Sequence, residues 1–175
     1  MNNIVISGIV KNKPVYSHKT YGEKFYSFFL ETERISGVTD IVNCIISESL
    51  VELAEVNSFI EVNGTIRTRN DKNRRLDITV FVMELREFIN QVDYVELEGY
   101  VCKKPVYRET PRGRYICDFM IACDRGKFNK TDYIPCIAWG RFAKHISLLE
   151  VGEKLKIIGR LQSREYEKRL SDGTK

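Results

Sequence analysis

Apolar and polar residues alternate along most of this chain with a period of two. The alternation is regular at 4–10 (IVISGIV) and 94–101 (YVELEGYV), and the stretches 25–32 and 115–124 are rich in aromatic and β-branched residues. This pattern is typical of strands with one buried face, because successive side chains point to opposite sides of a sheet. The chain is therefore predicted to be mainly β.

The pattern occurs twice, 91 residues apart. Gly-x-Val followed by Pro-Val-Tyr stands at 8–16 and again at 99–107, and the later segments correspond after one inserted residue. These later pairs are TDIVNCII (39–46) with TDYIPCIA (131–138), and NGTIRTR (63–69) with IGRLQSR (158–164). A period this long, seen only twice, predicts two tandem domains and not a solenoid.

We expect the domains to be residues 1–90 and 91–175, joined near Ile89–Gln91. Each copy reads as three strands, a short helix and a fourth strand, which is the order of an OB-fold, a small Greek-key barrel. In the first copy Ser49–Glu52 has the spacing of a helix capping box. In the second copy a helical face is predicted from the spacing of Phe142, Ile146 and Leu149. The predicted fold class is all-β, with a short helix in each domain: tandem OB-fold barrels.

The last strand of the barrel is present in only one copy. The first copy continues into a candidate fifth strand at 75–85, whereas only EYEKRLSDGTK follows Arg164 in the second. A barrel without its last strand leaves an open sheet edge. Two interpretations stay open: the chain is a truncated form of a longer protein, or another chain supplies the closing edge.

Composition narrows the class of protein. No apolar run approaches the roughly 20 residues that span a bilayer, and the N-terminus lacks the features of a signal peptide, so we expect a cytoplasmic protein with no membrane partner. The five cysteines form no CxxC pair and are expected to be reduced, and with only His18 and His145 available no zinc site is expected. Without clustered carboxylates, a nucleophile–base pair or a phosphate loop, we expect neither an enzyme nor a cofactor.

The charge is divided unevenly between the two copies. The whole chain carries a formal net charge of +4. Residues 1–90 carry −1 (11 Lys and Arg against 12 Asp and Glu), and residues 91–175 carry +5 (17 against 12). This asymmetry indicates that the second domain faces a polyanion.

The second copy also presents a candidate binding face. In the strand at 133–139, alternation places Ile134, Cys136 and Ala138 inward, and it places Tyr133 and Trp139 outward. In the following strand Leu155 and Ile157 point inward, and the outward residues include Lys156, Ile158, Arg160, Arg164 and Tyr166. If these two sets share one face, aromatic rings that stack on bases are interleaved with cations that follow phosphates. The alternative is that the rings only pack the barrel; the interleaved cations and the basic charge favour binding.

The equivalent face of the first copy has a different character. Ile41 and Ser47 stand where Tyr133 and Trp139 stand, and Glu61 replaces Lys156. The first copy still has aromatic residues near its first hairpin, namely Tyr16, Tyr21, Phe25 and Tyr26, so some contact with nucleic acid stays open there. We therefore expect the first domain mainly to dock on its twin or on another subunit.

The segments 103–124 and 138–167 resemble the OB domain of bacterial single-stranded DNA-binding proteins. The resemblance rests on a Thr-Pro-x-Gly turn at 110–113, an Asp-Phe-x-Ile-Ala strand at 118–122, Trp139-Gly140-Arg141, and GRLQSR with a following Tyr at 159–166. It implies that base-stacking aromatics occupy the positions of Tyr133, Trp139 and Tyr166, with Phe128 the nearest candidate for a fourth. The candidate binding set is completed by residues within these segments: Tyr107, Arg112, Arg114 and Arg141.

The resemblance implies sequence-tolerant binding of single-stranded DNA in replication, recombination and repair, with four barrels per assembly. Two barrels per chain then predict a homodimer. The chain departs from the family in its divergent first domain and in the absence of a linker and acidic tail, through which members recruit replication and repair proteins. Two alternatives stay open: an adaptor that mainly binds other proteins, and a preference for RNA over DNA.

Overall fold

The structure is a computed structural model that describes residues 1–127 and 129–163. The strands of the first half are β1 (Asn2–Val10), β2 (Val15–Thr20), β3 (Glu23–Glu33), β4 (Thr39–Ser47), β5 (Phe59–Asn70) and β6 (Leu76–Glu87). Those of the second half are β7 (Asp93–Val101), β8 (Val106–Glu109), β9 (Tyr115–Asp124), β10 (Thr131–Trp139) and β11 (Lys154–Gly159). A 3-10 helix, η1 (Glu48–Leu53), follows β4, and the helix α1 (Arg141–Ser147) follows β10.

Five strands of the first half close into a ring. β1 pairs with β3, β3 with β4, β4 with β6, β6 with β5, and β5 again with β1. All these pairs are antiparallel except β4 with β6, where Cys44 lies opposite Val80. The predicted barrel with its fifth strand near 75–85 is thereby confirmed for the first half.

The second half repeats this order with fewer strands. β7 pairs with β9 and β11, and β9 pairs with β10. Within the described residues no strand bridges β10 and β11 in the way that β6 bridges β4 and β5. The segment after Ser163 lies outside the described residues, so both interpretations of the missing strand stay open.

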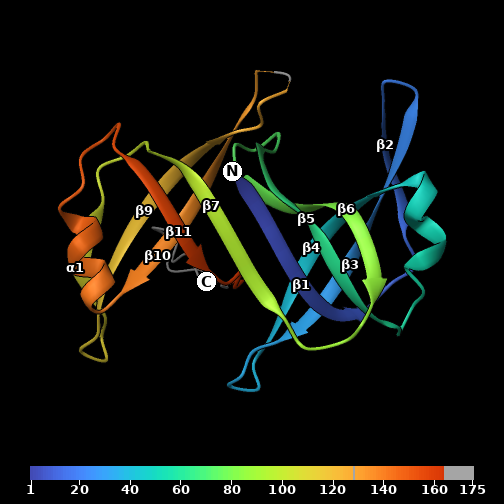
Figure 1. The fold of residues 1–175 in the computed structure, drawn as a ribbon, viewed down its shortest axis with the longest axis horizontal. Coiled ribbons are helices and arrows are strands. Elements are labelled where there is room, and N and C mark those ends of the chain that lie inside the picture. Colours follow the sequence, from blue (N-terminus) through green and yellow to red (C-terminus); the bar gives the residue numbers. More distant parts are fainter. Residues whose placement is uncertain (128, 164–175) are drawn as a thin grey trace, which may run out of the picture.

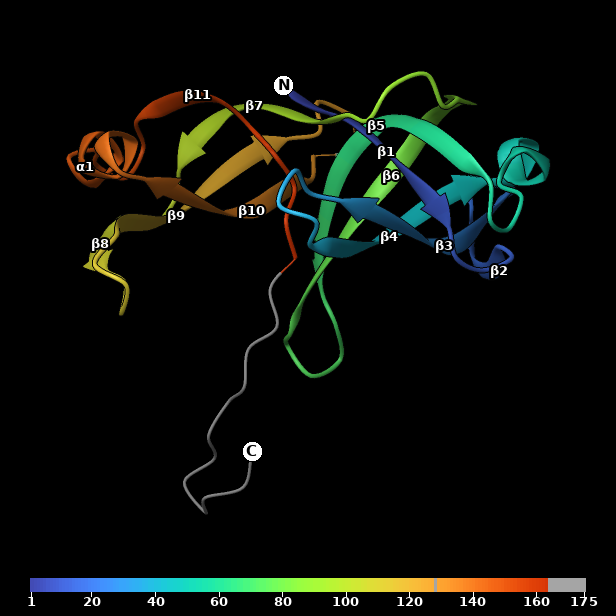
Figure 2. The ribbon, with the colours of Figure 1, turned by 90° about the horizontal axis from the view of Figure 1, so that it is seen from below.

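The first strands of the two halves pair with each other. β1 runs antiparallel to β7 from Asn2 opposite Leu97 to Ile6 opposite Asp93, so a continuous sheet passes from one half into the other. Figure 1 shows the halves side by side along the long axis, with β1 and β7 in the middle. The helices η1 and α1 lie at opposite ends of the molecule (Figure 2). Apolar residues of both halves, including Ile6, Val95 and Ile121, belong to one buried cluster.

The repeated Gly-x-Val motif has a steric origin. A Cβ atom at Gly8 would lie 2.3 Å from the carbonyl oxygen of Glu31, and one at Gly99 would lie 2.1 Å from that of Ala122. Real Cβ atoms do not approach backbone oxygens this closely, so only glycine lets β1 lie so near β3, and β7 so near β9. The sequence repeats the glycine because each barrel bends at the same place.

The short helices differ from their predictions. η1 begins at Glu48 as a 3-10 helix, and no side chain caps it, so the capping box predicted at Ser49–Glu52 was wrong. α1 ends at Ser147 and buries Ala143 and Ile146, whereas Phe142 is exposed. The predicted helical face was right only at Ile146: Phe142 is exposed and Leu149 lies beyond the end of the helix, because so short a helix buries only a narrow stripe against the barrel.

Within the described residues, no helix is both long and apolar enough to cross a membrane.

Candidate nucleic-acid interface

The alternation of β10 divides its side chains as the sequence predicted. Ile134 is buried, and Cys136 and Ala138 are partly buried, because they face the barrel interior. Tyr133 and Trp139 point outward, and 43% of Trp139 remains exposed. The indole is therefore not core packing. It is held at the surface at the end of a strand that is fixed over its whole length by pairing to β9.

The turn after β10 fixes where the indole lies. Gly140 has φ of 58° and ψ of −126°, a conformation that residues with a Cβ rarely adopt. Its N–H donates to the carbonyl of Tyr115 at 3.0 Å, which ties the end of β10 to the start of β9. Trp139, Gly140, Tyr115 and Arg114 line an open hollow of about 370 Å³. This hollow combines two aromatic rings with one guanidinium group.

A second aromatic pair continues this surface along the β8–β9 hairpin. The rings of Tyr107 and Tyr115 stack in parallel, with centroids 5.6 Å apart and an interplanar angle of 4°. The hairpin turn is closed by Gly113, whose positive φ of 72° suits glycine, and by a hydrogen bond from the Arg114 N–H to the Thr110 hydroxyl. Both rings are exposed, so the stack extends the surface beside Trp139.

Tyr115 was absent from the sequence-based candidates. The sequence placed Tyr115 in a strand. It gave no reason to bring this ring close to Trp139, which lies 24 residues later in the chain. The antiparallel register of β9 and β10, with Trp139 opposite Ile116, brings them together. Knowledge of that register was the only signal that could have found it.

The basic candidates fall into separate groups. Arg114 lies at the hollow, Arg112 is exposed in the hairpin turn, and the guanidinium of Arg141 lies over the ring of Phe142 at 5.3 Å. On β11, Lys156 forms an ion pair with Glu96 of β7 at 2.7 Å. This bond raises the pKa of Lys156 and lowers that of Glu96, and it places a carboxylate beside a cation predicted to meet phosphate.

The predicted outward sets of β10 and β11 do not form one paired surface in the described residues. Leu155 and Ile157 face inward, and Lys156, Ile158 and Arg160 are exposed, as predicted. However, β11 pairs with β7 and β10 pairs with β9, so the two sets flank the position where a fifth strand would lie. Three further candidates, Phe128, Arg164 and Tyr166, lie outside the described residues.

A buried clamp from the first half holds the start of β10. Asp132 accepts hydrogen bonds from Arg125 Nε at 2.8 Å and Nη2 at 2.6 Å, and from the backbone N–H of Thr68 in β5 at 2.8 Å. The Thr68 hydroxyl in turn accepts the backbone N–H of Tyr133 at 2.8 Å. The first half thus positions one of the predicted base-stacking residues.

The mirror of this clamp lies at the other end of the boundary. Asp40 is equivalent to Asp132 in the repeat, and it accepts from Arg34 Nε and Nη2, both at 2.6 Å, and from the backbone N–H of Ser163 at 2.8 Å. Burial raises the pKa of Asp40, but the hydrogen bonds from Arg34 and Ser163 outweigh it, so the pKa lies below its ordinary value. The halves are therefore joined by strand pairing and by two equivalent ionic clamps.

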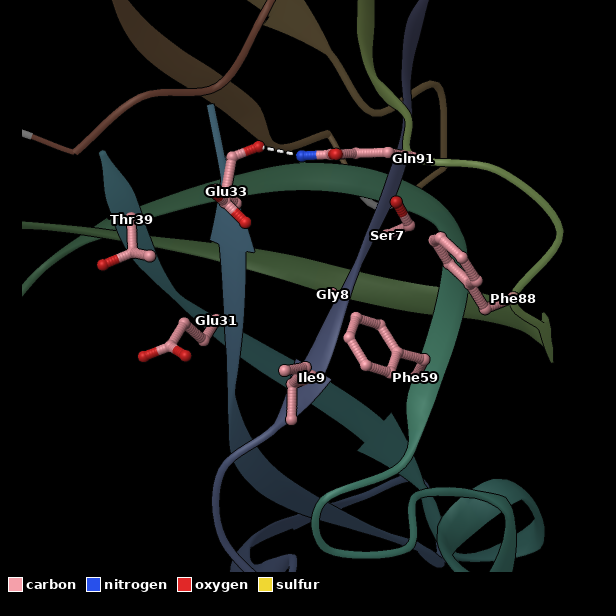
Figure 3. Close-up of a pocket in the computed structure, with 9 residues that line it drawn as sticks. All are labelled: Ser7, Gly8, Ile9, Glu31, Glu33, Thr39, Phe59, Phe88 and Gln91. Atoms are coloured by element: carbon pink, nitrogen blue, oxygen red, sulfur yellow. Dashed lines mark hydrogen bonds between the residues drawn. The ribbon is translucent and has the colours of Figure 1, made fainter. Parts of the chain in front are cut away.

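The first half has a hollow of a different kind. It measures about 100 Å³ and lies between β1, β3 and the segment that leads to β7. Figure 3 shows Phe59 and Phe88 on one side and Glu31 and Glu33 on the other. The carboxylates would repel a phosphate chain, so this hollow is a poor candidate for nucleic acid. The outward face of β4, which was expected to dock, is exposed at Ile41; its docking stays a prediction.

Comparisons with known proteins point to the second half. Residues 92–175 match a family model described as "Single-strand binding protein family". The chain is similar to a "Single-stranded DNA-binding protein" of Clostridium tetani, with 36% identity over 88 residues, 46% of this chain and 59% of that protein. It is also similar to "Single-stranded DNA-binding protein 1" of Staphylococcus aureus, with 37% identity over 79 residues, 42% of this chain and 47% of that protein. The chain spans about half the length of the curated relatives it matches.

In structure, most of the chain has a similar counterpart. The wild-type single-stranded DNA-binding protein from Thermus aquaticus has a TM-score of 0.77 and 21% sequence identity, over 93% of this chain and 85% of that one. At this identity the likeness shows the fold: OB barrels across both halves of the chain.

Proposed function

We propose that this chain, whose residues 92–175 match the model of the single-strand binding protein family, binds single-stranded DNA without strong sequence preference. The observation that carries the proposal is the exposed indole of Trp139, fixed beside Arg114 and Tyr115 at an open hollow. Unpaired bases present flat apolar faces on a chain of phosphates. A ring stacks on such a base for about 1–3 kcal/mol, whatever the base, and a neighbouring guanidinium follows the backbone.

The geometry favours single strands over a duplex. A hollow lined by rings receives a base face, which a duplex keeps covered, and the rings extend from Trp139 along the Tyr107–Tyr115 stack. Tyr133, Arg112, Arg141, Lys156 and Arg160 are proposed as further contacts along the path, and so are Phe128, Arg164 and Tyr166. We infer a binding protein and not an enzyme, since the family is defined by binding.

Several finer points belong to the same proposal. Members of the family from bacteria are described as single-stranded DNA-binding proteins, so we propose action on exposed DNA in the bacterial cytoplasm during replication, recombination and repair. We also propose that two chains associate to present four barrels, that the second half is the principal reader of DNA, and that replication and repair proteins are partners. Binding of RNA is the natural alternative, because the same rings stack on its bases.

The proposal is tested by titrating the intrinsic fluorescence of Trp139, the single tryptophan of the chain, with oligo-dT at two salt concentrations. Stacking should quench the indole, and the affinity should fall steeply with salt because phosphate contacts release counterions. Trp139→Ala, followed by an anisotropy assay, should weaken binding by about 1–3 kcal/mol. Ser47→Ala, at the equivalent position of the first half, should change little. Equal affinities for the two variants would exclude the indole as a stacking platform.

A further inference from the structure

Two ionic clamps of the same build hold the halves together, one at Asp132 and one at Asp40. In each, a buried carboxylate accepts two hydrogen bonds from one arginine and one from a backbone N–H of the other half. The clamps lie beside the ends of β9 and β3, which Figure 1 shows on opposite sides of the boundary between the halves. These are the two sides on which a strand of DNA could run from one half to the other.

The Asp132 clamp contains a second arginine that the Asp40 clamp lacks. Arg67 Nη1 lies 3.6 Å from Asp132 Oδ2, whereas the repeat places Gln162 at the equivalent position of the other clamp. The charge of Asp132 is already shared with Arg125 through hydrogen bonds of 2.6 and 2.8 Å. Burial lowers the pKa of Arg67, and the neighbouring Arg125 lowers it further. Two guanidinium groups thus meet one carboxylate, which leaves one positive charge over.

The Asp40 clamp has no positive charge to spare. Asp93, at the start of β7, accepts a backbone N–H that follows β11 at 2.9 Å, and its counterpart at the other clamp is the neutral Asn2. Burial raises the pKa of Asp93, and the Asp40 carboxylate acts in the same direction. The hydrogen bond and Arg160 oppose this shift without reversing it. Two carboxylates therefore take up the charges of Arg34 and Arg160.

The segments beside the clamps widen this difference. Residues 124–132 contain three basic and two acidic residues, whereas the equivalent residues 33–40 contain one basic and two acidic residues. With Arg67 included, the first group carries +2; with Asp93 and Arg160 included, the second carries −1. The acidic hollow of the first half also lies on the second side, because the first residue of β4 lines it. A phosphate chain is thus attracted to one side of the boundary and repelled from the other.

We propose that single-stranded DNA passes between the two halves on the side of the Asp132 clamp only, and that Arg67 of the first half binds a phosphate there. This inference rests on the proposed function and deepens it, because it names a path for the strand. Tyr133, a proposed base contact, is exposed beside this clamp, and its N–H is bonded to the Thr68 hydroxyl at 2.8 Å. The phosphates of a base stacked on Tyr133 therefore lie next to the surplus charge. A guanidinium group has five N–H donors, so Arg67 serves Asp132 and a phosphate at the same time.

The test replaces Arg67 in two ways. Arg67→Gln gives the Asp132 clamp the residue that the Asp40 clamp has, and Arg67→Lys keeps the positive charge. Anisotropy titrations use an oligo-dT of about 35 nucleotides, which spans two OB barrels at about 4–16 nucleotides each. We expect Arg67→Gln to bind about 10-fold more weakly and its slope of log affinity against log salt to decrease by about 0.7, the share of one phosphate. Arg67→Lys should keep the slope, and urea unfolding confirms that each variant is folded.

Two controls leave the proposed contact intact. Arg86→Gln removes an arginine of the first half that pairs with Glu84 outside both clamps, and it should leave affinity and slope unchanged. Asp93→Asn removes a carboxylate beside the Asp40 clamp and keeps an oxygen that accepts the backbone N–H. If the path has one side only, this variant also binds as the wild type does. Tighter binding with a steeper slope would show that DNA passes the Asp40 clamp as well, and would overturn the proposal.

The outcomes separate this inference from the proposed function. If Trp139→Ala weakens binding and Arg67→Gln does not, the chain binds DNA but no phosphate lies at Arg67. If Arg67→Gln weakens binding with an unchanged slope, Arg67 only holds the clamp together, and the phosphate contact is refuted. An equal loss in Arg86→Gln would refute it too, because the effect would then come from net charge alone. If neither Trp139→Ala nor Arg67→Gln weakens binding, the proposed function itself fails.

Discussion

The clamp at Asp132 makes a quantitative prediction about stability. Its carboxylate is fully buried, and it accepts from Arg125 and from the Thr68 N–H across the boundary between the halves. Asp132→Asn keeps the shape but removes the charge, and its amide N–H groups then oppose those of Arg125. Removing one member of a buried ion pair costs about 3–5 kcal/mol. Because 21% of the Arg125 side chain can still reach water, we expect the lower end, about 3 kcal/mol.

That loss is a large part of the roughly 5–15 kcal/mol that stabilises a typical domain. Urea unfolding followed by circular dichroism measures it as a lower midpoint. The matched control is Asp77→Asn, which breaks an Asp–Arg pair of similar geometry: Arg69 Nε lies 2.9 Å from Asp77, but 72% of the Arg69 side chain is exposed. Exposed pairs contribute about 0–1 kcal/mol. If both variants lose the same small amount, the clamp does not hold the halves together as we describe.

Three further predictions concern single residues. The folded-state pKa of Asp40 lies below its ordinary value of 3.8, so its ion pair stabilises the protein above that pH, and this contribution is lost as the pH falls through the lowered pKa. The difference in unfolding free energy between the wild type and Asp40→Asn should therefore shrink in acid. A difference that stays constant with pH would contradict the assignment. Gly99→Ala should lower the thermal midpoint, because the new Cβ would lie 2.1 Å from the Ala122 carbonyl oxygen. The control is Gly126→Ala, where a Cβ meets nothing within 4 Å; it should lower the midpoint only through the strain of its positive φ. Glu96→Gln should tighten binding of oligo-dT and steepen its salt dependence, since it releases Lys156 from its ion pair; unchanged binding would remove Lys156 from the DNA path.

Much of the candidate site could be read from the chain because side-chain alternation is local. The outward positions of Tyr133 and Trp139 and the inward positions of Ile134 and Ile157 follow from a period of two, and the structure places them accordingly. The helices were predicted less well, because a helix of one or two turns carries too few residues to define a face; Phe142 was assigned inward and lies outside. Tyr115 was missed because it reaches Trp139 only through the register of two paired strands.

The sequence by itself determined that this protein is an internal repeat of β-rich units, where most of the strands lie, and that Tyr133 and Trp139 of β10 face solvent. Those properties depend on neighbours in the chain and on the internal repeat. Only the tertiary structure decided that β1 pairs with β7, that Arg125 and Asp132 meet Thr68, and that Arg114, Tyr115 and Trp139 share one hollow. These contacts join residues far apart in the chain, and their partners are chosen by strand register and by the need to satisfy buried charge, which no local pattern encodes.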